Sequence, residues 1–145
     1  MTLTTPAPDL GLDLRKVPDL TDARARKRLS HAAIEVFFRM IEIWAVRNED
    51  AMSLLGGISN GRYFELKRSR RGVLTQDELT RISLLIGIFK ALNILFSQKL
   101  AQQWISRPNS NPMFHDEPPL LVLTRGGVPG MLSVRRLLDS RRGAR

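Results

Sequence analysis

The 145-residue sequence contains no cysteine, and it has only two histidines and one tyrosine. Without cysteine the chain cannot form a disulfide, a thiol nucleophile or a zinc site with thiolate ligands. The histidines, His31 and His115, lie far apart, and no nucleophile stands beside a base. The acids that follow His115 are consecutive loop residues without the spacing of metal ligands. We therefore predict no catalytic residue, no metal site, no cofactor and no enzyme activity.

Long hydrophobic runs are also missing. The most apolar stretch, residues 82–96, has roughly fifteen residues and is interrupted by Lys90, whereas a membrane-spanning helix needs about twenty. The N-terminal residues do not show the basic start and apolar centre of a secretory signal. We expect a cytoplasmic protein that does not enter the membrane.

Positive charge is abundant. Lysine and arginine number 23 against 14 acidic residues, which gives a formal net charge of +9, and 43% of the residues are hydrophobic. The hydrophobic fraction is sufficient for the core of one folded domain, which excludes a wholly disordered chain. The charge surplus favours an anionic partner such as nucleic acid or an acidic protein surface.

The spacing of apolar residues predicts an all-α protein. Residues 1–20 contain three prolines without periodicity and are predicted to be a flexible arm. From about Thr21 or Asp22 to near Val46, apolar residues recur every three or four positions, which predicts a long helix facing the core or an oligomer seam. A capping box from Thr75 to Glu78 begins a second long helix.

Two short predicted helices between these long ones have the order of a helix-turn-helix. Asn48 is the expected N-cap of the first, two glycines at 56–57 form the turn, and Ser59 caps the second. Tyr63 and Leu66 should face inward. The DNA-binding residues expected on this second helix are Ser59, Asn60, Arg62, Lys67 and Arg68. An ordinary helical hairpin with a solvated basic face remains the alternative.

The C-terminal segment resembles a known protein family. It contains Trp104, Pro108-Asn109, Phe114, then Pro119-Leu120-x-x-Leu123-x-x-Gly126 and Leu132-x-Val134-Arg135-x-x-Leu138-Asp139-x-x-Arg142-Gly143. This order resembles the toxin-binding domain of antitoxins of the Xre, MbcA and ParS type, and residues 82–96 are similar to the Xre-like helical part of that family. The residues alone are equally compatible with a structural cap on the core and with a surface that docks another protein.

The resemblance implies an Xre-like helix-turn-helix core followed by a small helical toxin-binding domain. The expected divisions are the arm at 1–20, the helix-turn-helix domain at 21–97 and the toxin-binding domain at 98–145. The partners implied are operator DNA and a RES-domain toxin, a protein that consumes NAD or transfers ADP-ribose from it. The antitoxin would cover the toxin's active site and repress its own operon, as a homo-oligomer suited to a palindromic operator.

Carried onto this sequence, the resemblance assigns toxin contacts to the last helix and the basic tail. We expect the apolar face of this helix to supply most of the affinity and the arginines to set register and association rate. We also expect truncation after Thr124 to leave a folded protein that no longer neutralises the toxin. The toxin-binding residues expected are Met131, Val134, Arg135, Leu138, Asp139, Arg142, Gly143 and Arg145.

Two other functions fit parts of the sequence. The first is a helix-turn-helix transcriptional regulator whose C-terminal domain binds an unrelated partner. The second is an RNA-binding or nucleoid-associated basic protein, which is disfavoured because the aromatic residues fall on apolar stripes and do not form exposed stacking platforms.

Overall fold

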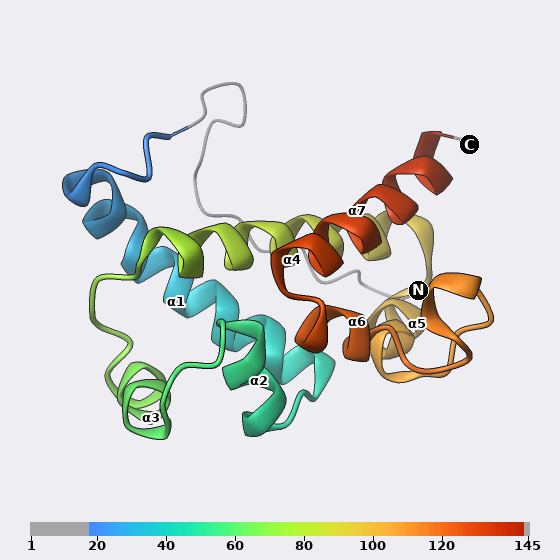
Figure 1. Ribbon diagram of the computed structural model, residues 1–145, viewed down its shortest axis with the longest axis horizontal. Helices are drawn as coiled ribbons and strands as arrows, with labels where there is room; N and C mark the ends of the chain where they lie inside the picture. Colours follow the sequence, from blue (N-terminus) through green and yellow to red (C-terminus); the bar gives the residue numbers. More distant parts are fainter. Residues whose placement is uncertain (1–17, 144–145) are drawn as a thin grey trace.

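A computed structural model describes residues 18–143. Most of the predicted N-terminal arm, and Arg145 at the other end, lie outside this described part. Within it the chain forms seven α-helices and two short 3-10 helices, with no strand, so the predicted all-α class is confirmed. The elements, drawn in Figure 1, are α1 (Ala23–Trp44), α2 (Asn48–Leu54), α3 (Asn60–Ser69), α4 (Gln76–Leu95), α5 (Gln98–Gln103), η1 (Trp104–Ser106), η2 (Pro112–Phe114), α6 (Leu120–Arg125) and α7 (Gly127–Gly143).

Side-chain caps fix where most of these helices begin. Asp22 accepts a hydrogen bond from the backbone N–H of Arg24 at the start of α1, and Ser59 accepts one from the backbone N–H of Arg62 at the start of α3. Both hydrogen bonds of the Thr75–Glu78 capping box are present at the start of α4. These bonds satisfy backbone donors that the first turn of a helix leaves without partners.

The predicted cap of α2 is wrong. Asn48 is the first residue of α2, and the N-cap is Arg47, whose side chain makes no capping hydrogen bond. The first turn of α2 contains the acidic residues Glu49 and Asp50, whose negative charges stabilise the helix by interacting with the positive end of its dipole.

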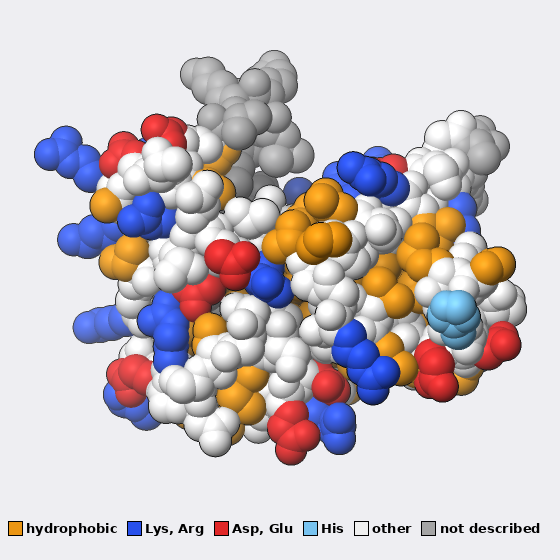
Figure 2. Space-filling view, viewed as in Figure 1, with side chains coloured by type: hydrophobic (Ala, Val, Ile, Leu, Met, Phe, Trp, Pro, Cys, Tyr) orange, Lys and Arg blue, Asp and Glu red, His pale blue; other side chains and the backbone are white. Residues whose placement is uncertain are grey.

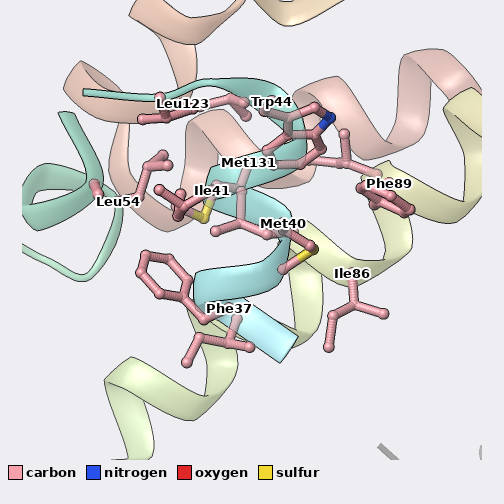
Figure 3. Close-up of a cluster of buried hydrophobic side chains, with 14 of the residues drawn as sticks. Phe37, Met40, Ile41, Trp44, Leu54, Ile86, Phe89, Leu123 and Met131 are labelled. Carbon is pink, nitrogen blue, oxygen red and sulfur yellow. The ribbon is translucent and has the colours of Figure 1, made fainter. Parts of the chain in front are cut away.

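One hydrophobic core joins the N-terminal and C-terminal helices. Helix α4 packs against α1 on one side and α7 on another, and α6 packs against α7 and α2. In Figure 3, side chains from α1, α4 and the C-terminal helices meet, among them Trp44, Phe89, Leu123 and Met131. The apolar face of α1 is therefore core.

The shared core spans the predicted boundary between the two domains. The predicted boundary between residues 97 and 98 falls directly after Ser97, the N-cap of α5, and the helices on both sides of it contribute to the same core. No helix in the described residues is long and apolar enough to cross a membrane.

Candidate functional site

The two sets of predicted binding residues lie toward opposite ends of the molecule. Figure 1 shows α3 at one end of the molecule and the C-terminal end of α7 at the other, with α4 running between them and α2 lying between α3 and α6. Arg62 of α3 pairs with Glu78 near the start of α4, and Ile94 lies near its end. At about 1.5 Å per residue, the 16 residues from Glu78 to Ile94 correspond to roughly 24 Å along α4. Each region is described in turn.

Helix α3 is held against the rest of the protein by buried and hydrogen-bonded side chains. Tyr63 and Leu66 are buried, as predicted. The Tyr63 hydroxyl donates a hydrogen bond to Oδ1 of Asn48 over 3.0 Å, and Nζ of Lys67 donates to the same oxygen over 2.9 Å. Asn48 therefore connects α2 to α3, which explains its presence at a position where it does not cap.

A second link joins α3 to α4 through an ion pair. Nη2 of Arg62 lies 2.6 Å from Oε1 of Glu78, and Nε of Arg62 lies 3.0 Å from Oε2. Glu78 is only 3% exposed. Burial alone would raise the pKa of Glu78, but the hydrogen bonds from Arg62 and from the Thr75 backbone hold that pKa below its ordinary value. The fold thus keeps Glu78 ionised and keeps Arg62 beside it.

The C-terminal end of α3 is attached to α1. The backbone N–H of Leu74 donates to Oγ of the buried Ser30 over 2.8 Å, across 44 residues of sequence. The guanidinium of Arg70 lies 4.7 Å from the centre of the Phe38 ring and 3.6 Å from a carboxylate oxygen of Glu35. The basic loop predicted at residues 70–72 is therefore fixed in position.

The outward face of α3 carries a different set of residues. Ser59, Asn60, Lys67 and Arg68 are exposed, and Arg62 is partly buried. The three cations also have partners within the protein: Arg62 pairs with Glu78, Lys67 with Asn48 and Arg68 with the exposed Glu65. Between the exposed polar residues lie Gly61 and Phe64, which were not among the predicted DNA-binding residues. A signal for Phe64 existed, because its position on the helical wheel places it away from Leu66.

Basic side chains border this face. Arg68 forms an exposed ion pair with Glu65 at 2.7 Å, and Arg71 is exposed in the following loop. In Figure 2, lysine and arginine side chains project from the edge of the molecule where α1 and α3 lie. An arrangement of cations around a helix that projects from the surface suits an anionic partner.

At the other end, the predicted apolar contact face of α7 is buried. Met131, Val134 and Leu138 are each 0% exposed and belong to the hydrophobic core. Side chains without accessible surface cannot contact a partner, so the expectation that these three supply the affinity is wrong. The same burial contradicts the expected truncation after Thr124, because removing α7 would expose the face of α4 on which it packs.

The polar residues predicted on α7 do form one surface. Arg135, Asp139, Arg142 and Gly143 line a shallow depression together with Ile94 of α4. Nε of Arg135 lies 3.1 Å from Oδ2 of Asp139, and Nη1 of Arg142 lies 3.7 Å from Oδ1 of the same carboxylate. Asp139 thereby holds both arginines on one side of the helix.

Gly87 of α4 makes room for Arg135. A Cβ atom at this glycine would lie 1.5 Å from Nη1 of Arg135, so the guanidinium passes directly over the glycine. Ile94, about two helical turns further along α4, is 56% exposed and is the most exposed large hydrophobic side chain among the described residues. Ile94 was not among the predicted site residues, because the apolar composition of residues 82–96 does not show which of these side chains the fold leaves exposed.

Neither surface has the features of a catalytic or metal site. Among residues 18–143 no three histidine or acidic side chains are grouped closely enough to hold a metal ion. What the two surfaces offer is exposed charge around an isolated apolar side chain, Phe64 at one end and Ile94 at the other. Such surfaces suit binding to macromolecules.

Comparisons with known proteins agree with this arrangement. Residues 23–87, which extend from the start of α1 to the middle of α4, match the protein family described as the antitoxin Xre-like helix-turn-helix domain. The chain is 35% identical over 113 residues to the uncharacterized protein y4oB of Sinorhizobium fredii, an alignment that covers 77% of this chain and 85% of y4oB. No solved structure matches. The chain belongs to the same family as y4oB and carries an antitoxin Xre-like helix-turn-helix domain, within which α2 and α3 lie.

Proposed function

We propose that this protein neutralises a RES-domain toxin by covering the toxin's active site and that it represses its own operon by binding operator DNA. It would do both by binding, without chemistry of its own. The observation that carries the proposal is the presence of two exposed, charged surfaces on one core, the α3 surface near the start of α4 and the α7 surface near its end. One protein of this kind can hold DNA and a toxin at the same time.

The surface proposed for the toxin is the depression formed by Ile94, Arg135, Asp139, Arg142 and Gly143, which we call the α7 surface. Ile94 is an apolar side chain surrounded by charged groups, which is the usual composition of a protein interface with a central anchor and a polar rim. Because Asp139 pairs with both arginines, the cluster is ordered before binding and loses less side-chain entropy on association.

A toxin that uses NAD must hold a pyrophosphate, so its pocket should contain cationic or amide donors. The carboxylate of Asp139 is the group of the α7 surface that matches such donors, and the two arginines would contact the rim of the pocket. Blocking the pocket requires shape and burial of Ile94 more than charge. This proposal replaces the buried Met131, Val134 and Leu138 of α7 with residues at the surface of α4 and α7.

The surface proposed for DNA is the outward side of α3. A helix-turn-helix places its second helix in the major groove, and a dimer reads two half-sites related by a two-fold axis. We propose that Ser59, Asn60 and Arg68 contact the DNA directly and that Arg62 and Lys67 support the helix that carries them.

The test is neutralisation by the variant Ile94→Glu in cells that express a RES-domain toxin which the wild-type protein neutralises. A buried carboxylate at the anchor should reduce neutralisation at least a hundredfold, measured as surviving colonies and cellular NAD, because burying an unpaired charge at an interface is costly. Val73→Glu is the matched control, since Val73 is 47% exposed but precedes α4 at the opposite end. Val73→Glu should protect as well as the wild type.

Two results would overturn the proposal. Full protection by Ile94→Glu would remove the α7 surface from the toxin contact. Purification of the protein with a stoichiometric partner that does not consume NAD, after the partner is separated and refolded, would favour a helix-turn-helix regulator with an unrelated partner.

A further inference from the structure

The outward face of α3 has a composition that packing within this protein does not explain. Gly61, Phe64 and Arg68 are spaced three and four residues apart, so they share one face, and Tyr63 and Leu66 occupy the opposite, buried side. This face, which we call the α3 outward face, contains one glycine, one large aromatic residue and one cation. Each requires a separate reason.

Phe64 is exposed but fixed in orientation. Its side chain is 45% exposed, and its ring meets the buried Tyr63 ring edge to face, with 5.1 Å between ring centres and 80° between ring planes. An aromatic ring held in this way can contact a partner with little further loss of conformational freedom. The cost of exposing it to water is compensated only if a partner covers it.

Nothing within the chain requires a glycine at position 61. Its backbone does not adopt a positive φ, and a Cβ atom built there would meet nothing within 4 Å. Glycine in a helix is less favourable than alanine by up to about 1 kcal/mol. Neither backbone geometry nor packing therefore calls for a glycine here, which leaves the close approach of a partner to the helix backbone.

The charges around this face indicate what the partner is. Lys67, Arg68, Arg70 and Arg71 follow Phe64 within seven residues, and the acid of this segment, Glu65, is already paired with Arg68. The exposed large hydrophobic side chains at this end are Phe64 and, in the loop after α3, Val73, and two side chains do not make the broad apolar patch that a second copy of the chain would bury. A polyanion with a small apolar group is the better match.

We infer that the α3 outward face reads thymine, with the ring of Phe64 packed on thymine methyl groups in the major groove and Gly61 allowing the helix to approach the bases. The inference rests on the proposed DNA binding. The major groove exposes the thymine methyl, which apolar side chains contact, and helix-turn-helix proteins use the N-terminal part of the second helix for base contacts. Gly61 and Phe64 lie in that part of α3.

The experiment uses the full-length protein and a library of random-sequence DNA duplexes. The preferred sequence is selected, and each thymine in it is then replaced with deoxyuridine, which lacks only the methyl group. We expect one or two replacements per half-site to weaken wild-type binding about fourfold each, since burial of one methyl-sized group is worth a factor of about four. Replacements elsewhere in the sequence should have no effect.

The variant Phe64→Ala should bind the selected duplex at least tenfold more weakly and should no longer distinguish thymine from deoxyuridine. Phe64→Leu, which keeps an apolar side chain, should retain part of the discrimination. Val73→Ala is the matched control, because it truncates an exposed apolar side chain outside α3 and should leave both affinity and discrimination unchanged. Thermal unfolding of all three variants checks that the fold is intact.

The outcomes separate this inference from the function on which it rests. If the wild type selects no sequence from the library, sequence-specific DNA binding fails and the inference fails with it. If the wild type selects a sequence but deoxyuridine has no effect on its binding, or if Phe64→Ala keeps the discrimination, the thymine contact is wrong while operator binding stands.

Discussion

The two ends of this protein differ in which predicted residues the fold uses for itself. At the α3 end, three of the polar residues expected to contact DNA, Arg62, Lys67 and Arg68, are bound to other side chains of the protein. At the α7 end the apolar residues expected to contact the toxin are in the core, and the polar ones are exposed. In both regions the predicted set contains residues that hold the fold together as well as residues that are exposed and free to contact a partner.

The comparison shows that the exposed apolar side chains are the more informative feature. The exposed large hydrophobic side chains among the described residues are Phe64 and Val73 at the α3 end and Ile94 at the α7 end. Phe64 and Ile94 each lie on a surface that carries an arginine paired with an acid. Within each end, substituting a buried residue should lower stability, whereas substituting an exposed residue nearby should lower binding.

The largest effect is expected from Leu138→Ala. Leu138 is 0% exposed between α7 and α4, so its truncation should lower the free energy of unfolding by about 2–5 kcal/mol, from lost burial and the cavity that remains. Ile94→Ala, at a mostly exposed side chain in the same region, should change it by less than about 0.5 kcal/mol. Urea denaturation followed by circular dichroism measures both.

Equal losses of unfolding free energy in these two variants would contradict the prediction. If Ile94→Ala destabilised the protein as much as Leu138→Ala, Ile94 would belong to the core in solution and could not be a toxin anchor. If Leu138→Ala were neutral, α7 would not be packed on α4 as the structure has it.

A smaller effect is expected from Glu78→Gln, which removes charge at the α3 end. Glutamine can still complete the capping box with Thr75, so the change isolates the ion pair with Arg62. Because Glu78 is buried while Arg62 is partly exposed, the loss at pH 7 should lie between that of surface and buried pairs, about 1–3 kcal/mol. The variant Glu65→Gln, which removes the solvent-exposed pair with Arg68, should have a much smaller effect on stability.

The pH dependence gives the sign of the same effect. The pKa of Glu78 is lowered in the folded protein, so below about pH 4.3, the ordinary value for glutamate, the unfolded state binds a proton first. The wild type then loses stability as the pH falls through the lower, folded-state pKa. The difference between wild type and Glu78→Gln should be full at pH 7 and should shrink in acid. A difference independent of pH would mean that the pair contributes no charge stabilisation.

Local signals made most of the fold predictable. The caps at Ser59 and Thr75 and the inward pair Tyr63 and Leu66 depend on residues within one or two turns, and all are found where the sequence places them. Asn48 was misassigned because its real partners, Tyr63 and Lys67, are 15 and 19 residues away. A residue that is a good cap locally can be drawn to a distant donor by tertiary packing.

The candidate sites were less predictable, for the same reason. Whether Arg62 is free for DNA depends on Glu78, and whether Val134 is free for a toxin depends on how α7 is rotated against α4. Sequence periodicity identifies an apolar stripe on α7 but does not say whether the chain or a partner covers it. The exposure of Ile94 follows from the same rotation.

The smallest stability effects, and the sharpest separation of the two ends, are expected from two glycine-to-alanine changes. Gly61→Ala fills open space on α3 and should raise the free energy of unfolding by about 0.4–1 kcal/mol, because alanine restricts the unfolded chain. Gly87→Ala gains less, since its Cβ must push Arg135 away from α4. Thermal denaturation compares the two.

Each substitution should weaken one binding activity and leave the other intact, even where it raises stability. Gly61→Ala should weaken operator binding while leaving toxin neutralisation intact, because a methyl group would stand between α3 and the bases. Gly87→Ala should weaken neutralisation and leave operator binding intact, because the displaced Arg135 can no longer hold its place beside Asp139. If either substitution impaired both activities equally, the two ends would not act as independent surfaces, and neither glycine would owe its presence to a partner at its own end.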